Sequence, residues 1–296
     1  MIIHKGDIPI LNYPSCIIPG IFDGVHIGHQ HLIKEAIESS KKSNITPILF
    51  TFLQHPRSSQ YILQEKERDR ILAELGIKHL VLADFNRIKG LSPSQYIELL
   101  LTNLKIKEVW CGEDFCFGKN RRGNIKRLKA MGKEKGFLVF VIEDISFSNT
   151  RISTSLIKDL LLQGRIKEAN SFLKRPLSFS GIVFLSQGRG KKFGFPTANL
   201  MWDENLFCPR KGVYFVKVKL DNEIFNGMAN LGIRPTFDEK NLILETHIFD
   251  FNRNIYGKEI TIFFHQWIRD EIRFNNENEL FLKIKDDKER CRNLYL

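Results

Sequence analysis

The pattern of hydrophobic residues changes near residue 175, and this change limits the folds that the chain can adopt. Before it, short apolar runs alternate with amphipathic helical segments. The runs lie at residues 16–18, 46–52, 78–82, 107–111 and 137–142. Strands that alternate with helices favour a parallel sheet with right-handed crossovers. The sequence therefore predicts an α/β domain with a parallel sheet over residues 1–175.

After residue 175 the helical periodicity stops. Short apolar or alternating segments follow at residues 179–184, 213–218, 224–229, 242–249 and 259–264. Turn residues such as Asp221-Asn222 and Arg234-Pro235 separate these segments. Short strands at such regular spacing predict a small antiparallel β-barrel over residues 176–296, ending in a helix at about residues 277–288.

The hydrophobic content and the cysteines limit the classes of protein to which the chain can belong. The chain has 296 residues and 43% hydrophobic content, which is enough for two domain cores. No apolar run approaches the roughly 20 residues that a membrane span needs, and the N-terminus lacks the zones of a signal peptide. The five cysteines form no C-x-x-C pair. We therefore expect a cytoplasmic protein with reduced thiols and no membrane partner.

The formal net charge of +11 raises the possibility of a nucleic-acid partner. Lysine and arginine are nevertheless spread along the chain, with only short clusters at residues 119–122 and 189–192. Both clusters lie beside glycines in predicted loops, a setting that suits nucleotide phosphates as well as a nucleic-acid backbone. We expect small-molecule phosphates and no nucleic acid, with most of the remaining cations on a solvated surface.

A glycine-rich turn follows the first apolar run, at residues 20–29. It joins a strand to a helix, so it lies beside the free N–H groups of a helix start, where phosphate binds well. Two glycines let the backbone approach a ligand, and two imidazoles stand beside it. The candidate residues are Gly20, Phe22, Asp23, Gly24, His26, Gly28 and His29. A tight turn with two surface histidines remains the alternative.

Three further segments carry polar residues toward the same region. The loops at residues 51–57 and 112–118, the second with Asp114, follow strands, and ligands on parallel sheets bind at the carboxyl ends of strands. At a later helix start, hydroxyls and cations suited to a polyphosphate gather. They are Arg151, Thr154, Ser155 and Lys158. An ordinary N-cap with a solvated lysine would explain them equally well.

The second half contains one comparable stretch, at residues 188–199. Its glycines and cations, Gly188, Gly190 and Lys191, can wrap phosphates with backbone N–H groups. Thr197 and Asn199 present two oxygen ligands for a hard cation such as Mg²⁺. The Walker sequence G-x-x-x-x-G-K-[ST] is absent, and a plain barrel loop remains the alternative.

These motifs together resemble the bacterial bifunctional riboflavin kinase/FMN adenylyltransferase (FAD synthetase) family. Residues 22–29, 51–57, 112–115 and 151–158 follow the order of motifs in its adenylyltransferase module, which belongs to the nucleotidyltransferase superfamily with an H-x-G-H element. G-F-P-T-A-N at residues 194–199, R-P-T at 234–236, the strand with Glu245 and R-D-E at 269–271 resemble its kinase module. The motifs cover nearly the whole chain.

The resemblance implies a Rossmann-like nucleotidyltransferase domain followed by a β-barrel riboflavin kinase domain with a C-terminal helix. It implies that ATP phosphorylates riboflavin to FMN and that a second ATP adenylylates FMN to FAD, with Mg²⁺ as cofactor and release of pyrophosphate. Glu245, His26 and His29 would be catalytic, and Thr197 and Asn199 would bind the metal. Nucleotide and phosphate contacts would come from Gly20, Phe22, Asp23, Gly24, Gly28, Asp114, Arg151, Thr154, Ser155, Lys158, Gly188, Gly190, Lys191, Gly194 and Pro196. Flavin contacts would come from His55, Pro56, Arg57, Arg234, Pro235, Thr236, Arg269 and Glu271.

The chain departs from the family pattern at one cluster. The family sequence S-S-T-x-I-R is Ser153 to Lys158 here, and a lysine lacks the bidentate fork that arginine offers to phosphate. An arginine common at the position of Leu156 is also missing. One alternative is therefore a monofunctional riboflavin kinase with a weakened or relic adenylyltransferase domain. Another is an RNA-binding protein or a tRNA synthetase fragment, although no K-M-S-K-S-like loop is present. We expect a monomer or a weak homo-oligomer.

Overall fold

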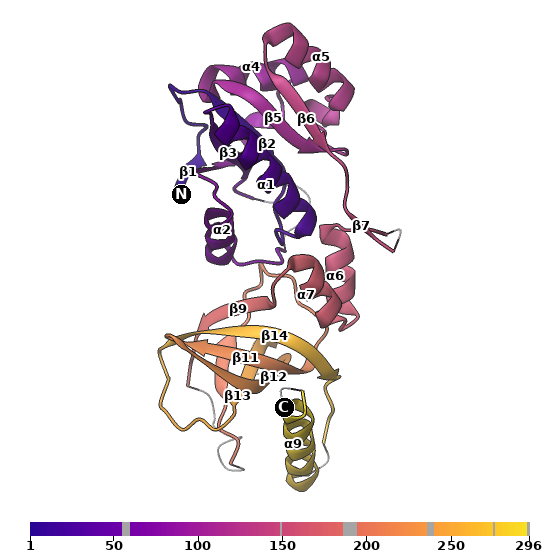
Figure 1. Cartoon of the computed structure of the whole chain (residues 1–296). Coiled ribbons are helices and arrows are strands. Elements are labelled where there is room, and N and C mark those ends of the chain that lie inside the picture. The colour runs from indigo at the N-terminus through magenta and orange to yellow at the C-terminus, as the bar shows by residue number, and fades with distance from the viewer. Residues whose placement is uncertain (55–59, 149, 186–193, 236–239, 275, 295–296) are drawn as a thin grey trace. The chain divides into compact units, whose positions relative to one another are not determined.

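Two units of the chain each hold most of their contacts within themselves. The computed structural model describes residues 1–54, 60–148, 150–185, 194–235, 240–274 and 276–294, and gives no side-chain detail for residues 234, 235, 240 and 241. The first unit is Met1–Tyr61 with Glu65–Thr154, and the second is Ile62–Gln64 with Ser155–Leu296 (Figure 1). The domain boundary predicted at residues 175/176 marks a change of element type, whereas by contact the helices between residues 154 and 173 group with the second unit.

The first unit contains the predicted parallel sheet. Its strands among the described residues are β1 (Ile2–Gly6), β2 (Ser15–Pro19), β3 (Thr46–Phe52), β4 (His79–Ala83), β5 (Ile106–Gly112) and β6 (Leu138–Ile142). They lie in the order β1-β4-β3-β2-β5-β6, and every neighbouring pair is parallel. The prediction of a parallel sheet is confirmed. The carboxyl ends of β2, β3 and β5 therefore meet at one edge of the sheet.

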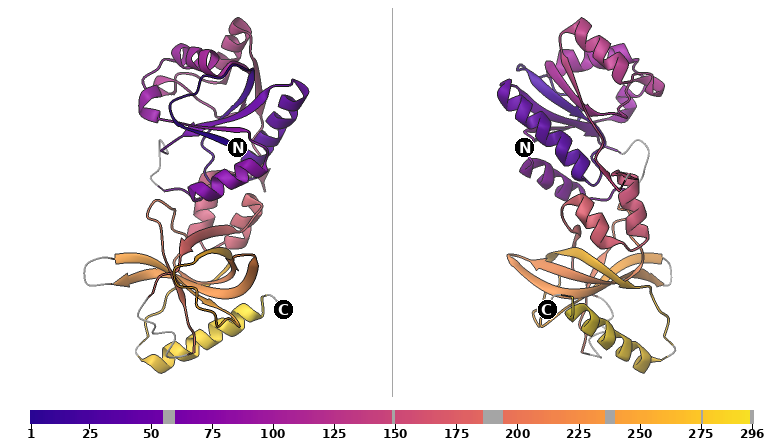
Figure 2. Two further views of the ribbon diagram at one scale, coloured as in Figure 1. Left: turned by 90° about the vertical axis from the view of Figure 1, so that its left-hand side faces the viewer. Right: turned by 45° about the vertical axis from the view of Figure 1, so that its right-hand side comes forward.

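Helices cover both faces of this sheet. They are α1 (Ile27–Lys42), α2 (Glu65–Glu74), α3 (Phe85–Ile88), α4 (Pro93–Leu104) and α5 (Ile125–Lys135), with a 3-10 turn at Lys119–Arg121. On one face the Sγ of Cys16 contacts the backbone of Ala36 in α1. Ile17, next along β2, packs instead into the core beneath α4 and α5. This alternation fixes α1 on one face and α4 and α5 on the other (Figure 2).

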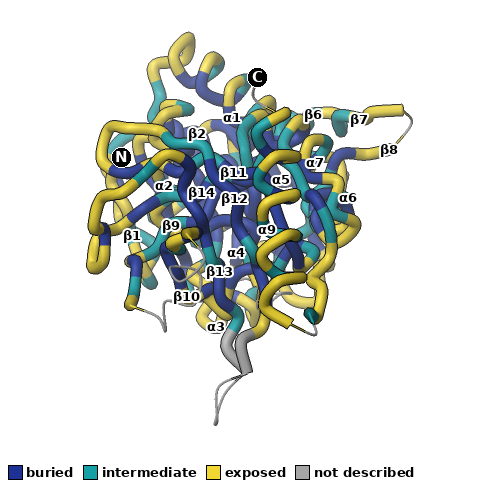
Figure 3. The backbone as a smooth tube through the Cα atoms, turned by 90° about the horizontal axis from the view of Figure 1, so that it is seen from below, coloured by how far each residue is buried: buried dark blue, intermediate teal, exposed yellow. Residues whose placement is uncertain are grey.

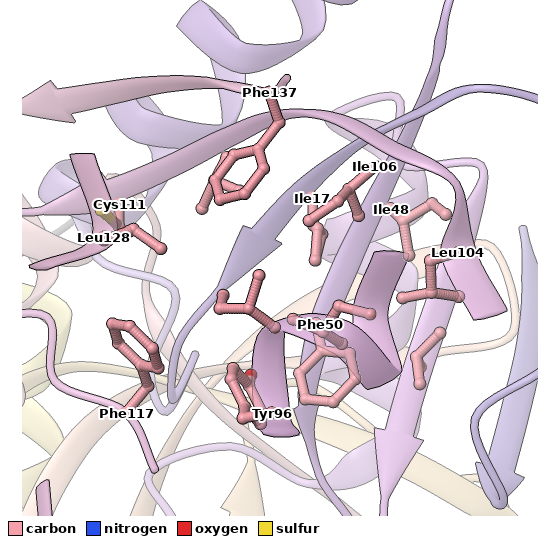
Figure 4. Packing of buried hydrophobic residues seen from close by; sticks show 14 of the residues in the cluster. Ile17, Ile48, Phe50, Tyr96, Leu104, Ile106, Cys111, Phe117, Leu128 and Phe137 are labelled. Carbon is pink, nitrogen blue, oxygen red and sulfur yellow. The ribbon is translucent and has the colours of Figure 1, made fainter. Parts of the chain in front are cut away.

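A hydrophobic core of the first unit lies between the sheet, α4 and α5 (Figure 4). Phe50 and Tyr96 meet edge to face at 6.2 Å, and Leu104 and Ile106 are buried beside them. Fully burying an aliphatic or aromatic side chain of this size stabilises a fold by about 1.5–3 kcal/mol. Ser92 and Gln95 form a capping box at the start of α4.

A hairpin and two helices follow the sheet. The hairpin pairs β7 (Ser146–Phe147) with β8 (Thr150–Arg151), and the helices are α6 (Thr154–Leu162) and α7 (Ile166–Leu173). Figure 3 draws the hairpin in the colour of exposed residues. Gly164, with a φ angle of 75°, lies between the two helices.

The second unit contains an antiparallel sheet that nearly closes into a barrel. Its strands among the described residues are β9 (Leu177–Ile182), β10 (Ala198–Met201), β11 (Gly212–Leu220), β12 (Glu223–Pro235), β13 (Lys240–Ile248) and β14 (Glu259–Arg269). They lie in the order β10-β13-β12-β11-β14-β9. A bridge between Phe184 and Asn199 brings the two ends of the sheet together. The predicted barrel is confirmed.

Two features of this unit differ from the sequence expectations. Arg234-Pro235, predicted as a turn, ends β12 and pairs with β13. Proline is tolerated there because it lies at the end of the strand. Gln64, from a segment expected in the first domain, pairs its amide with the backbone of Ser180 at 2.7 and 2.8 Å and so belongs to the second unit.

The C-terminal helix α9 (Glu277–Arg292) packs on the outer face of the barrel sheet. A second core fills this interface, with Phe215 and Met228 from the strands, Phe249 directly after β13, and Cys291 from the helix. Figures 2 and 3 show α9 along this face and the strands beneath it largely buried. In the described part of the chain, no helix combines the length and apolar character needed to cross a lipid bilayer.

Candidate active sites

The turn between β2 and α1 forms the centre of the first candidate site. Gly24 and Val25 have positive φ angles of 80° and 41°, which turn the chain sharply into the helix. His26 occupies the N-cap position, and its carbonyl accepts the first helical hydrogen bond, from Gln30 N at 2.9 Å. In the described structure its side chain makes no capping hydrogen bond. The first-turn N–H groups of α1 are thus suited to an anion.

His26 and His29 stack face to face, with ring centroids 3.8 Å apart. A Cβ atom on Gly28 would lie 3.2 Å from the His26 ring, so glycine at this position leaves room for the imidazole. The ring of Phe22 lies tilted against that of His29, with the ring centroids 5.0 Å apart. A Cβ atom on Gly20 would in turn lie 3.1 Å from the Phe22 ring. The two glycines therefore permit the ring stack as well as a close approach of the backbone to a ligand.

The environment of His29 favours its neutral form. Burial lowers the pKa of His29 well below its ordinary value, and the nearby His26 and Arg151 lower it further. A neutral imidazole keeps one N–H for hydrogen bonding. The buried Nδ1 of His29 has no hydrogen-bond partner among the described residues, as expected of a group that a ligand satisfies.

Arg151 connects this turn to two other segments. Its Nη2 lies 3.1 Å from Asp114 Oδ2, in the loop after β5, and its Nε lies 2.8 Å from Asp144 Oδ2, in the loop after β6. Thr154 Oγ1 donates to the carbonyl of Asp23 at 3.1 Å. The structure therefore brings together Asp23, Asp114, Arg151 and Thr154 from three separate stretches of sequence.

Asp144 was not predicted from the sequence. Its carboxyl group is desolvated enough to raise its pKa, even though Arg151 beside it acts in the opposite direction. The signal that could have found it was present, because Asp144 follows a strand of the parallel sheet. The strand-end rule that selected the loops at residues 51–57 and 112–118 applies to it equally.

The other residues predicted for this site either group with the second unit by contact or are not described. Ser155 and Lys158 lie on α6 in the second unit. There the ammonium group of Lys158 lies over the ring of Phe207, 5.4 Å from its centroid. His55, Pro56 and Arg57 lie outside the described residues, so their predicted flavin contacts stay predictions.

A row of polar residues across three strands forms the second candidate site. Glu245 of β13 lies directly opposite Asn199 of β10 on one side and Asn230 of β12 on the other. Residues directly opposite in antiparallel pairs project from the same face of the sheet. The register therefore aligns an amide, a carboxylate and a second amide on the outer face. Asn199 and Glu245 were predicted from the sequence as site residues, whereas Asn230 was not.

Thr197 and Asn199 have the chemistry that a hard cation requires. Asn199 Nδ2 lies 3.2 Å from the Thr197 carbonyl and 3.5 Å from Thr197 Oγ1. Asn199 is 3% exposed, and its Oδ1 has no hydrogen-bond partner among the described residues. A buried oxygen in this state gains from a ligand, and a hydroxyl and an amide oxygen are both ligands of the kind that Mg²⁺ takes. The residues present therefore fit a magnesium ion.

Glu271 and Arg269, both predicted flavin contacts, have different surroundings. A Cβ atom on Gly232 would lie 1.9 Å from Glu271 Oε1, so the carboxylate depends on glycine at that position, and Asn230 Nδ2 lies 3.5 Å from the same oxygen. Arg269 instead binds Asp287 of α9, with its Nη2 2.6 Å from Asp287 Oδ2. Glu271 thus lies beside the polar row, whereas Arg269 anchors the C-terminal helix.

Several residues predicted for this site fall outside what the structure describes. Gly194, with a φ angle of 77°, and Pro196 are described and precede Thr197. Gly188, Gly190, Lys191 and Thr236 lie outside the described residues, and the side chains of Arg234 and Pro235 are not described.

Known proteins match both halves of the chain. The FAD synthetase family model matches residues 11–156, and the riboflavin kinase family model matches residues 173–295. A bifunctional riboflavin kinase/FMN adenylyltransferase from Bacillus subtilis (strain 168) is 34% identical over 291 residues, covering 94% of this chain and 91% of that protein. One from Buchnera aphidicola subsp. Schizaphis graminum (strain Sg) is 35% identical, covering 94% and 93%.

A solved structure matches the fold as a whole. It is described as a macrolide-efflux protein from Streptococcus pneumoniae and superposes with a TM-score of 0.89 at 30% identity, covering 99% of this chain and 98% of that one. Relatives matched over nearly their whole length and two family models in succession agree with one another. The chain therefore belongs to the bifunctional riboflavin kinase/FMN adenylyltransferase family.

Proposed function

We propose that this protein makes FAD from riboflavin in two steps, each at one of the candidate sites. The second unit phosphorylates riboflavin to FMN, and the turn with His26 and His29 serves the adenylylation of FMN. The observation that carries the proposal is the row formed by Asn199, Glu245 and Asn230, which puts a carboxylate between two amides. Asn199 is also, with Thr197, one of the two candidate ligands of a magnesium ion. The matches to both family models support the pairing of the two reactions.

In the kinase step the 5′-hydroxyl of riboflavin attacks the γ-phosphorus of ATP. An alcohol at neutral pH needs a base in the transition state, and Glu245 takes the proton as the new P–O bond forms and ADP leaves. Thr197 Oγ1 and Asn199 Oδ1 would hold Mg²⁺, which would neutralise charge on the phosphates. Glu271, beside Asn230, would contact the flavin. Gly188, Gly190, Lys191, Gly194 and Pro196 would line the nucleotide phosphates.

In the adenylyl step a phosphate oxygen of FMN attacks the α-phosphorus of a second ATP, and pyrophosphate leaves. The nucleophile is already an anion, so no base is required. The protein aligns the reactants and stabilises developing charge. His29 supplies an N–H from a neutral ring, Arg151 supplies positive charge, and the first turn of α1 supplies backbone N–H groups.

The compartment, the oligomeric state and the partners of the protein are also part of the proposal. We propose that the protein acts in the cytoplasm on free riboflavin, FMN and ATP, as a monomer or weak homo-oligomer and without nucleic acid. The odd number of cysteines and the absence of any C-x-x-C pair support a reducing compartment.

The division of labour between the sites can be tested with Glu245→Ala. We expect this variant to form no FMN from riboflavin and ATP, because the hydroxyl loses its base, while it still converts supplied FMN to FAD. Chromatography of the flavin products measures both reactions. Equal loss of both activities would refute the assignment of Glu245 to one site.

A further inference from the structure

The side chain of His247 contacts the chain just beyond the point where the pairing between β10 and β13 ends. The ladder runs from Met201 opposite Ile243 to Ala198 opposite Thr246. Pro196 has no N–H and cannot donate to a longer ladder. Its carbonyl instead lies 2.9 Å from His247 Nδ1, one residue beyond the last ladder partner on β13. Because a carbonyl can only accept, Nδ1 carries the hydrogen.

The imidazole of His247 is held in one orientation. It is 5% exposed and lies edge-on to the rings of Phe195 at 5.3 Å and Phe249 at 5.7 Å. Burial lowers its pKa, which favours the neutral ring with a single N–H. The Nε2 atom has no hydrogen-bond partner among the described residues. The ring therefore directs its one donor at Pro196.

This contact fixes the segment that carries the metal ligands. Thr197 lies between Pro196, held by His247, and Ala198, held by the β-ladder. Asn199, next in the ladder, reaches back with its amide nitrogen to the Thr197 carbonyl. The short segment from Pro196 to Ala198 is therefore held at both ends. This restraint sets the directions of the Thr197 hydroxyl and the Asn199 amide oxygen.

We propose that His247 is a positioning residue of the kinase site, which holds the Pro196 carbonyl and so presets Thr197 and Asn199 for magnesium. The proposal rests on the proposed role of these two residues as metal ligands. Groups that support ligands without touching the metal set its affinity strongly, and their loss commonly weakens binding about 10–100-fold.

The test compares three substitutions of His247 in the full-length protein. His247→Asn keeps an N–H near the position of Nδ1, His247→Gln puts it near Nε2, and His247→Leu removes it. The readout is the Mg²⁺ concentration needed for half-maximal riboflavin binding in the presence of ADP, followed by flavin fluorescence. We expect about a tenfold increase for the leucine and glutamine variants, and recovery of most of the affinity in the asparagine variant.

Two controls separate positioning from a general effect on folding. Conversion of supplied FMN to FAD should be unchanged in all three variants, because that site lies in the first unit. In a Thr197→Ala background, His247→Leu should cause little further loss, because the two residues act through the same ligand. Equal losses in the leucine and asparagine variants, or full additivity with Thr197→Ala, would overturn the proposal.

The outcomes also distinguish this inference from the proposed function. If Thr197→Ala alone leaves the Mg²⁺ requirement unchanged, the assignment of the metal ligands is wrong. If Thr197→Ala raises the requirement but His247→Leu does not, the ligands are right and the positioning role of His247 is wrong.

Discussion

Burial of His29 makes the stability of the first unit depend on pH. In an unfolded chain the imidazole titrates near pH 6.5, but in the folded protein its pKa lies well below that value. Between the two pKa values the unfolded chain binds more protons. The stabilisation that accompanies the neutral ring is therefore complete above pH 6.5 and is lost as the pH falls toward the folded pKa. We predict that His29→Gln reduces the acid loss of stability, because glutamine does not titrate.

Urea unfolding at pH 7.5 and at pH 5.5, monitored by hydrogen exchange in β2 and β5, measures how much the free energy of unfolding falls with pH in each protein. His31→Gln is the matched control, because His31 is exposed on the same helix. The control should keep the pH dependence of the native protein. An unchanged acid loss in His29→Gln would show that protonation of His29 does not contribute to it.

Short motifs made part of the two sites predictable from the sequence. His26, His29, Thr197 and Asn199 stand in compact motifs, and their residue types alone suggest phosphate and metal chemistry. Partners at long range were not predictable in this way, because they depend on register and on loop paths. Asn230 joins Glu245 only through the pairing of β12 with β13.

Elements were predictable where burial imposes a pattern and were missed where it does not. Strand β1 is an edge strand whose residues are mostly exposed, so it has no buried apolar run. Strand β10 has four residues and follows directly on the Thr197 segment, which was read as a loop. In contrast, β3, β5 and β11 are buried through most of their length, and each was predicted.

A buried ion pair helps to anchor α9 on the barrel sheet. Asp287 is 1% exposed, and Nε and Nη2 of Arg269 lie within 3.0 Å of its carboxylate. Removing one partner of a buried pair leaves the other charge without compensation, at a cost of about 3–5 kcal/mol. We predict that Asp287→Ala lowers the free energy of unfolding of the second unit by roughly 3 kcal/mol. Urea titration with hydrogen exchange in β14 and α9 measures this loss.

The neighbouring Asp286 provides the matched control. It forms an exposed pair with Lys283 at 2.6 Å, and such surface pairs contribute little. Asp286→Ala should lower the free energy of unfolding by less than about 1 kcal/mol. Similar losses in the two variants would show that the depth of the pair does not determine its contribution.

In the proposed function the two reactions use separate sets of residues, which predicts that they can be divided between molecules. Glu245 belongs to the second unit, and His29 belongs to the first. Glu245→Ala should make no FMN, and His29→Ala should lose about 10²–10³-fold in FMN adenylylation through a missing donor. Neither variant alone should convert riboflavin and ATP to FAD at an appreciable rate.

A mixture of the two variants should nevertheless produce FAD. The His29→Ala variant makes FMN, which leaves it and is adenylylated by the Glu245→Ala variant. FAD should therefore follow a lag during which FMN accumulates, and the lag should shorten as the Glu245→Ala concentration is raised. Time courses of flavin products resolved by chromatography measure both quantities. If FMN accumulates and no FAD forms at any concentration, although Glu245→Ala adenylylates added FMN, then FMN made by one molecule is not released to another.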